Sequence, residues 1–541
     1  MSRVSSYIVW GVIGSAVLGT ACRQPEPVAV EAEAKLEVAW FEGTADEAFA
    51  HAKAVGKPLF LYWGAEWCPP CHYLKDKIFV QPDFVTRSRD FVAVYLDGDD
   101  EGAQILGEQL DVQGYPTVMV YSAEGDELLR MPSDVPVSRY AAVMERALRL
   151  DRPVKQILDT VLAGGPADSD PADLDVLAYY SWGQDSQIGL DVAARLGTFE
   201  RLWAETPAEY SGAKARFLGL YLGEGARLAR RAEADAPPIF DDAERAELLE
   251  ATSLLLADPA LCRENVFDIT YGASGVIPVL SPYGGAVRDA LLDAWRAAAQ
   301  RLESDEELST DDRLTAASTL MDLARLEAGN DDGPLPTDLV AHVREHVAWA
   351  VGAVEDGGEL QTVLNTAAFL LENAGLAGEA QALLADKLDE AEAPYYFMSF
   401  LAGLKSDAGE TDEALALYRQ AWESARGRYT RFRWGSTYLR QLMELAPERA
   451  DAVEADSLAV LDELLTHDDA FALGNSLRLG QLAKAYGKWN TGEERGPVVD
   501  RIRERVAAEC TRYPAEGEDS QHQRCSAWLA SQPTFQVITQ P

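Results

Sequence analysis

Two cysteines separated by two prolines lie where an apolar run ends and a helical pattern begins. Residues 57–76 read KPLFLYWGAEWCPPCHYLKD, so Cys68 and Cys71 directly follow a continuous apolar stretch of strand length. Such a run, without polar alternation, is typical of a strand buried on both faces. After Cys71 the apolar residues have helical spacing. The cysteines are therefore predicted at the N-terminus of a helix that follows a central strand.

This motif has two incompatible interpretations. Cys68, Cys71 and His72 spell C-x-x-C-H, a haem c attachment signature, while the two cysteines alone form a redox C-x-x-C. A haem site would need both thiols for thioether bonds and His72 for the iron. A zinc site would need two more ligands, which no second C-x-x-C or nearby Cys/His pair supplies. The strand and helix around the motif favour the dithiol, with His72 expected on the surface in the first helical turn.

The following residues alternate between strand and helix patterns. Residues 90–99 have the pattern of a second buried strand and residues 101–112 of a short helix. Residues 114–131 predict two strands joined by a Glu-Gly-Asp turn, and residues 138–150 an amphipathic helix. Strands that alternate with helices and end in a hairpin predict a mixed sheet flanked by helices, which is an α/β domain.

Residues 36–150 resemble the thioredoxin fold. The resemblance depends on the segment from Trp67 to Cys71 and on Gly114-Tyr115-Pro116-Thr117, which corresponds to the cis-proline loop of that family. The stretch KDKIFVQPDFV after the dithiol resembles the periplasmic C-terminal domain of DsbD-type thiol reductases and their relatives more than cytosolic thioredoxin. The resemblance implies thiol-disulfide exchange, with an extended client segment pairing beside Pro116 and with Trp67 and Tyr115 forming an apolar rim.

The start of the helix suggests how the two thiols divide the chemistry. If Cys68 is the N-cap residue, its sulfur faces free backbone N–H groups and the positive end of the helix dipole, which favours the thiolate. Cys68 is thus the predicted nucleophile and Cys71 the resolving thiol. Pro69 and Pro70 have no N–H to donate, so of the nearest three residues only Cys71 can bond the Cys68 sulfur. A less stabilised thiolate of this kind predicts a reducing or intermediate redox potential.

Two positions depart from the family pattern. Thioredoxins carry a buried Asp six residues before the first cysteine and a Lys partner for it, whereas this chain has Tyr62 and Tyr95. The usual proton acceptor for the second cysteine is therefore absent, and Glu66 or water is expected to replace it.

The N-terminal residues are typical of an exported protein. Arg3 precedes an apolar stretch, Tyr7 to Ala21, that is short for a membrane span, and LGTAC resembles a bacterial lipobox with Cys22 as the acylated residue. Plain secretion and an uncleaved signal anchor are the alternatives. Residues 1–22 are thus a predicted signal peptide of lipoprotein type, and residues 23–35, rich in Pro, Glu and Ala, a flexible tether.

Export permits disulfides, which affects how the remaining cysteines are interpreted. Cys510 and Cys525 flank a polar loop between two helical patterns, and we expect a structural disulfide there, with two buried thiols as the alternative. Cys262 is expected to be a small core residue.

Charge narrows the choice of partners. The 48 Lys and Arg against 89 Asp and Glu give a net charge of −41. Such a surface repels phosphate backbones and anionic lipid, so nucleic acid is not expected as a partner.

Residues 152–541 have helical periodicity almost throughout. Gly375, Ala380, Leu383 and Leu384 recur 34 residues later as Gly409, Ala414, Leu417 and Tyr418. This resembles a pair of tetratricopeptide units near residues 362–425, and we expect an irregular α-helical solenoid that binds a partner or only packs. His342, Glu345 and His346 spell the H-x-x-E-H of inverzincin peptidases, but their wholly helical surroundings favour two histidines beside a core stripe.

Two functions compete. The first is an exported thiol-disulfide oxidoreductase of the bacterial periplasm or cell envelope, without a cofactor, in which residues 152–541 select clients. It implies protein clients with thiols or disulfides, an upstream redox partner, and membrane attachment through lipid on Cys22. The alternative is a helical scaffold or assembly protein with a secondary redox domain.

Overall fold

The computed structural model describes residues 37–530, except residues 134, 185–186, 234–235, 331–332, 355–356, 493 and 514–519. The described residues from Val38 onward belong to one compact unit. The predicted signal peptide, including Cys22, and the predicted tether lie outside the described residues.

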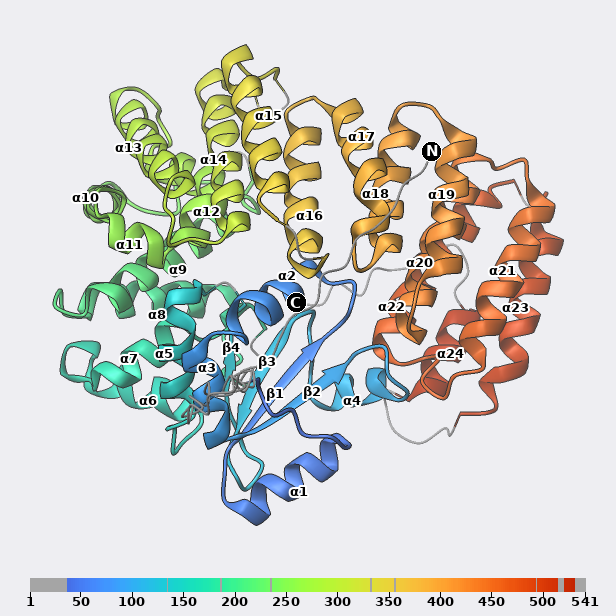
Figure 1. Ribbon diagram of the computed structural model, residues 1–541, viewed down its shortest axis with the longest axis horizontal. Helices are drawn as coiled ribbons and strands as arrows, with labels where there is room; N and C mark the ends of the chain where they lie inside the picture. Colours follow the sequence, from blue (N-terminus) through green and yellow to red (C-terminus); the bar gives the residue numbers. More distant parts are fainter. Residues whose placement is uncertain are drawn as a thin grey trace, which may run out of the picture. The chain divides into compact units, whose positions relative to one another are not determined.

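A four-stranded mixed sheet forms the centre of the N-terminal α/β part (Figure 1). The strands lie in the order β2-β1-β3-β4. β1 pairs in parallel with β2 and antiparallel with β3, and β3 pairs antiparallel with β4. The bounds are Leu59–Gly64 for β1, Val92–Asp97 for β2, Thr117–Tyr121 for β3 and Glu127–Met131 for β4. The predicted α/β class and mixed sheet are confirmed.

Helices cover both faces of this sheet because successive strand side chains point to opposite sides. Leu59 and Leu61 of β1 pack with helices α1 and α4, whereas Phe60 and Tyr62 pack with α2, α3 and α5. The helix bounds are α1 Ala45–Val55, α2 Pro69–Tyr73, α3 Pro82–Arg87, α4 Ala103–Gln109 and α5 Val137–Ala147, and a π-helical turn, Leu74–Ile78, continues α2. Burial on both faces explains why β1 is a continuous apolar run.

Beyond α5, the described part of the chain contains helices and no β-strand. This confirms the predicted all-helical region. The first of these are α6 Val154–Gly164, α7 Pro171–Ala178, α8 Val192–Glu205, α9 Ser211–Ala229, α10 Asp242–Ala257, α11 Pro259–Glu264, α12 Val266–Leu280, α13 Ala286–Glu303, α14 Thr310–Ala328 and α15 Thr337–Gly352. The remainder are α16 Gly357–Asn373, α17 Ala377–Lys387, α18 Pro394–Asp407, α19 Thr411–Ser424, α20 Arg428–Leu445, α21 Ala450–Leu465, α22 Leu473–Trp489, α23 Gly496–Cys510 and α24 Gln521–Ala530. In the described part of the chain no helix combines the length and apolarity that a membrane crossing requires.

The repeated residues of the helical region occupy matching places in two helix pairs. Gly375 follows α16 and Gly409 follows α18, both with a left-handed backbone at φ 77° and 81°. Ala380 and Ala414 are fully buried near the start of α17 and α19. The small residues thus end one helix and allow the next to approach it. The tetratricopeptide assignment itself stays a prediction.

The apolar core does not end at the expected domain boundary near residue 151. One continuous cluster of buried residues runs from Phe60 on β1 to Trp528 on α24. The backbone N–H of Ser181 donates to the carbonyl of Arg130 on β4 at 3.0 Å, and the buried Arg130 guanidinium donates to the carbonyl of Gln184 at 3.3 Å. Residues after 151 therefore complete the edge of the α/β part.

His342 and His346 lie one turn apart on α15 and are engaged within the helical region. The Nε2 of His342 lies 2.9 Å from a carboxylate oxygen of Glu303. The Nε2 of His346 donates to the carbonyl of Arg313 at 3.2 Å, and its ring stacks on Trp349. Across the described residues, no three or more His, Cys, Asp or Glu side chains form a metal-binding group.

Candidate functional site

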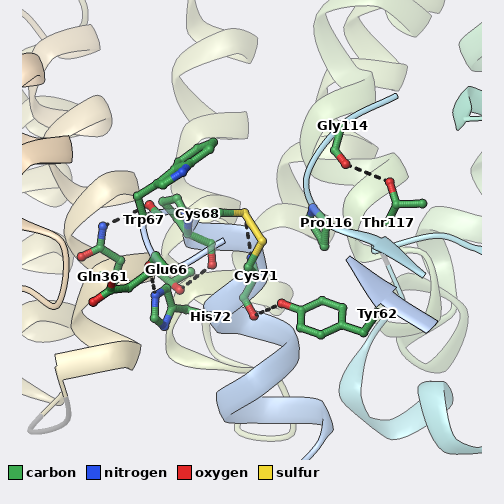
Figure 2. Close-up of a disulfide and its surroundings, with 12 residues drawn as sticks. Tyr62, Glu66, Trp67, Cys68, Cys71, His72, Gly114, Pro116, Thr117 and Gln361 are labelled. Atoms are coloured by element: carbon green, nitrogen blue, oxygen red, sulfur yellow. Dashed lines mark hydrogen bonds between the residues drawn. A yellow bond between two sulfur atoms is a disulfide. The ribbon is translucent and has the colours of Figure 1, made fainter. Parts of the chain in front are cut away.

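Cys68 is the N-cap residue of α2, as the sequence predicts. Its Sγ accepts the backbone N–H of Cys71 at 3.2 Å, while Pro69 and Pro70 occupy the first two helical positions and have no N–H to offer. The two sulfurs are bonded at 2.27 Å (Figure 2). A free N–H at a helix start stabilises negative charge on the sulfur that it contacts.

The loop of Gly114, Pro116 and Thr117 lies on the side of the disulfide away from Trp67 (Figure 2). The Tyr115-Pro116 peptide bond is cis. Thr117 is buried, and its hydroxyl donates to the carbonyl of Gly114 at 2.8 Å, which closes the loop. Gly98, at the end of β2, makes room for the neighbouring Tyr115, since a Cβ atom there would lie 1.9 Å from the Tyr115 hydroxyl oxygen.

Tyr62 and Tyr95 replace the charged pair of the thioredoxin pattern. Tyr62 is fully buried, and its hydroxyl donates to the carbonyl of Cys71 at 3.2 Å (Figure 2). The two rings stack with centroids 5.2 Å apart, and Tyr95 donates to Asp97 at 2.8 Å. Burial, followed by the charges of Tyr140, Asp97 and Asp76, raises the pKa of Tyr62 well above its usual value. A neutral phenol that orients the Cys71 backbone thus replaces an ionisable proton acceptor.

Glu66, predicted to replace that acceptor, forms an ion pair with the helical region. Its Oε1 lies 2.9 Å from Nη1 of Arg426, which precedes α20. Its carbonyl accepts the ring N–H of His72 at 2.6 Å.

His72 is buried, so the prediction of a surface position is wrong. The residue is 2% exposed, with its Nδ1 3.5 Å from carboxylate oxygens of both Asp76 and Glu392. Burial alone would lower the pKa of His72, but the bonds to Asp76 and Glu66 and the charge of Glu392 outweigh it and raise the pKa. With Nε2 bonded to Glu66 and both cysteines in a disulfide, these residues do not fit a covalent haem site.

Helices of the C-terminal region cover Trp67 and Tyr115, the two residues of the predicted apolar rim. Trp67 is only 7% exposed. Its ring stacks on Tyr396 of α18 at 6.3 Å, and the Arg433 guanidinium of α20 lies 3.9 Å from its centroid. Tyr115 stacks on Tyr429 of α20 at 6.4 Å. Cys68 is 1% exposed and Cys71 is fully buried.

Backbone groups at the start of α2 also bond to the helical region. The Gln361 side chain of α16 donates to the carbonyl of Trp67 at 3.3 Å, as Figure 2 shows, and Thr362 donates to the carbonyl of Pro69 at 3.0 Å. On the loop side, Gln184 donates to the carbonyl of Pro116 at 3.1 Å. We name Gln361, Thr362, Tyr396, Tyr429 and Arg433 together the cover.

Buried carboxylates surround the cover. Asp99 accepts both the backbone N–H and the hydroxyl of Thr430, each at 2.6 Å, yet burial raises its pKa to about 6. On the other side of α2, the Tyr73 hydroxyl donates to Asp312 at 3.4 Å. Burial raises the pKa of Asp312 to about 6 and that of its neighbour Asp311 to about 7.

The other cysteines lie in the helical region, away from α2. Cys510, the last residue of α23, is bonded to Cys525 of α24, as predicted, with a Cα–Cα distance of 5.6 Å. Cys262 is buried, and burial raises its pKa. A raised pKa keeps a thiol protonated and inert.

The structure brings together every predicted residue of the dithiol site, and it adds residues that sequence reasoning missed. The missed residues are those of the cover, together with Gln184 and Thr430. Gln361 lies 294 residues from its partner Trp67 in sequence. No local motif marks them, because their contribution depends only on where the helices pack.

Comparison with known proteins supports the reading of the N-terminal part. A family model described as a thioredoxin-like domain matches residues 45–148. The thiol:disulfide interchange protein DsbD of Klebsiella pneumoniae is 32% identical over 101 residues, and DsbD 1 of Pseudomonas aeruginosa is 26% identical over 106 residues. These matches cover 18% and 19% of this chain and 17% and 18% of the relatives.

Among solved structures, a chain titled DsbH oxidoreductase matches at 25% identity with a TM-score of 0.20. The match covers 25% of this chain and 96% of that one. The present chain spans less than a fifth of the length of the curated relatives that it matches. Residues 45–148 therefore form a thioredoxin-like domain, similar in sequence to DsbD, with the bonded Cys68–Cys71 pair at its helix start.

Proposed function

We propose that this chain is a thiol-disulfide oxidoreductase that exchanges disulfides with protein clients through Cys68 and Cys71. The observation that carries the proposal is the Cys68 sulfur at a helix N-cap, bonded by the Cys71 N–H at 3.2 Å, beside a cis Pro116. Such a position favours the thiolate form that attacks disulfides.

The exchange proceeds in two displacements. The Cys68 thiolate attacks one sulfur of a client disulfide, so that a Cys68–client bond forms and the other client sulfur leaves as a thiolate. Cys71, after losing its proton, attacks the Cys68 sulfur, which forms the Cys68–Cys71 disulfide and releases the second client thiolate. Two electrons have then passed from the dithiol to the client. The reverse sequence oxidises a client, and an upstream dithiol or disulfide partner resets the pair.

Neighbouring residues support these steps. Tyr62 holds the Cys71 carbonyl, and Thr117 holds the loop of Pro116. Water or Glu66 takes the proton of Cys71. For Glu66 to accept this proton, its carboxylate must first break the ion pair with Arg426.

The cover gives residues 152–541 a part in this chemistry. Because Trp67 and Tyr115 are stacked under Tyr396, Arg433 and Tyr429, a client must displace these side chains to reach Cys68. We propose that the helical region selects the client or partner that can do so. A second candidate, a helical scaffold with a secondary redox domain, is favoured by the same contacts, since they keep the dithiol closed.

The cell envelope is the proposed location. Export through residues 1–22 with acylation of Cys22 is consistent with an oxidising or redox-controlled compartment, in which disulfide exchange has substrates. The proposed partners are protein clients, an upstream redox protein, and a membrane that holds the lipid.

Reduction of insulin by dithiothreitol in the presence of the full chain tests the activity. We expect the wild type to accelerate insulin precipitation and Cys68→Ser to lose that acceleration. An equal rate for the two proteins, or no acceleration by either, would instead support the scaffold.

A further inference from the structure

Three arginines, one of them the cover residue Arg433, have no acidic partner among the described residues. Arg433 and Arg440 lie on α20, and Arg478 lies on α22. Nearby Arg431 pairs with Glu463 and Arg428 with Glu101. Among the described residues, no carboxylate comes within 4.0 Å of Arg433, Arg440 or Arg478. This is unexpected in a chain with 89 acidic and 48 basic residues. We name these three residues the arginine cluster.

The other contacts of the arginine cluster leave most of its donors without an acceptor. Arg478 donates to the Tyr429 hydroxyl through Nε and Nη2, both at 3.2 Å. Arg433 contacts only rings in the described part, with Trp67 at 3.9 Å and Trp434 at 5.0 Å. The Nε of Arg440 is buried without a hydrogen-bond partner. A buried donor without an acceptor is unfavourable, so an anion that accepts from these groups would be stabilised.

The three positive charges also act on one another. Burial lowers the pKa of Arg433 and of Arg440, and the charge of Arg478 lowers both further. The nearest acidic influence on Arg440 is Glu444, whose carboxylate is already 3.2 Å from Lys488. A negative group that enters between charges of this kind lowers their free energy, because it attracts all of them and offsets their mutual repulsion.

The position of the arginine cluster connects it to the dithiol. Arg433 lies over the ring of Trp67, the residue before Cys68. Arg478 donates to the hydroxyl of Tyr429. The Tyr429 ring in turn stacks on Tyr115, the residue before Pro116. Arg440 lies two helical turns beyond Arg433, roughly 10 Å further along α20. The cluster thus begins at the rim of the disulfide and extends away from it.

We propose that Arg433, Arg440 and Arg478 bind an acidic segment of the protein client whose disulfide meets Cys68. This inference rests on the proposed function. Guanidinium groups bind carboxylates with two parallel hydrogen bonds. A segment in the polyproline II conformation advances about 3.1 Å per residue with three residues per turn, so acidic side chains three residues apart lie on one side, about 9 Å apart, and span the two arginines of α20. The net negative charge elsewhere does not prevent this contact, because salt screens charges beyond about 8 Å at physiological ionic strength.

Binding can be measured without any redox step. The full chain carrying Cys68→Ser and Cys71→Ser is titrated into a labelled, cysteine-free peptide with glutamate at every third position and glycine between, and anisotropy is recorded. We expect binding that weakens with added salt, and about tenfold weaker binding for each of Arg440→Gln and Arg478→Gln, which corresponds to about 1.4 kcal/mol. Both variants leave the Arg433 contact with Trp67 intact. Arg344→Gln and Arg501→Gln, which remove exposed arginines already paired with Glu379 and Glu454, should bind as the parent does.

Three results would overturn the proposal: peptide binding that is equal in all variants, binding of a glutamine-for-glutamate peptide as tight as that of the acidic one, or inorganic phosphate binding as tightly as the peptide. The last would assign the cluster to a small anion. A chain that binds the peptide through the cluster but does not reduce insulin would lose the proposed redox function and keep the site. A chain that reduces insulin but does not bind the peptide would lose only the site.

Discussion

The two disulfides in the described part of the chain are both buried but differ in what surrounds them. Cys68 and Cys71 lie three residues apart, and Cys510 and Cys525 fifteen apart, and all four are at most 5% exposed. The first pair begins a helix, contacts an N–H and faces a cis-proline loop. The second joins α23 to α24, where His522 donates to the carbonyl of Cys510 at 3.0 Å.

This difference shows that burial and bonding do not separate a redox pair from a structural one. What separates them is the local backbone, since only the Cys68 sulfur is the N-cap of a helix. The surroundings differ too, because two side chains of α16, distant in sequence, bond to the backbone on both sides of Cys68. The following predictions test the contrast.

The largest effect is expected from removing the resolving thiol. Cys71→Ser can form a mixed disulfide with a client but cannot release the client. Clients should therefore accumulate as covalent adducts that dithiothreitol reduces. Non-reducing electrophoresis followed by mass spectrometry measures them. Cys525→Ser is the matched control and should trap none. Adducts that form equally in both variants would contradict the assigned roles of the two pairs.

Removing the second disulfide should change stability and not turnover. Closing a loop of this length stabilises a fold by about 3 kcal/mol in the chain-entropy model, so Cys510→Ser with Cys525→Ser should lower the free energy of unfolding by about that amount. Urea unfolding gives the value, and insulin reduction at low temperature should match the wild type. A large loss of turnover in the folded double variant would mean that the second pair takes part in exchange.

Weakening the cover should expose the first pair. Tyr396→Ala removes the ring that stacks on Trp67, and we expect alkylation of the reduced Cys68 to become about tenfold faster, corresponding to about 1.4 kcal/mol of lost contact. Iodoacetamide labelling at fixed pH measures the rate. Tyr438→Ala is the control, because Tyr438 stacks on Trp422 within the helical region and does not touch Trp67. Equal rates in the two variants would show that Tyr396 does not limit access.

The smallest effect concerns pH at the edge of the cover. Burial raises the pKa of Asp99 from 3.8 to about 6, so between these values the unfolded chain releases a proton that the folded chain keeps. Asp99 therefore makes no difference to stability below pH 4 and lowers it progressively up to about pH 6. Asp99→Asn cannot ionise and should melt at the wild-type temperature at pH 4 but a few degrees higher at pH 7.5.

Thermal unfolding monitored at several pH values checks this expectation. Glu124→Gln, in the exposed turn between β3 and β4, is the control and should follow the wild type at every pH. A melting difference for Asp99→Asn that is constant with pH would contradict the raised pKa.

The sequence was sufficient for features that depend on neighbouring residues. The apolar run at β1, the prolines after Cys68 and the Gly-Tyr-Pro-Thr loop predicted the strand, the N-cap and the cis proline correctly, because each depends on local backbone preferences. The departure at Tyr62 was also visible, since it replaces one residue in a known pattern.

Features that depend on distant packing could not be predicted. His72 looked like a surface residue because its own helix turn gives no sign of Glu392, which approaches from 320 positions further along the chain. For the same reason, no residue near Trp67 or Tyr115 in sequence indicates the helices that cover them. The helical periodicity of residues 152–541 says which face of a helix is apolar, but not that α16 lies against α2 or that α18 and α20 contact Trp67.

The two hydrogen bonds from α16 to the start of α2 link the redox equilibrium to the packing of the chain. The carbonyls of Trp67 and Pro69 flank Cys68 and accept from Gln361 and Thr362. In a thermodynamic cycle, the total free energy of docking the helical region and reducing the disulfide is the same whichever step comes first. A docking free energy that differs by about 1.4 kcal/mol between the two redox forms would shift the midpoint potential by roughly 30 mV. The helical region would then adjust the oxidising strength of the dithiol without contributing an atom to the exchange.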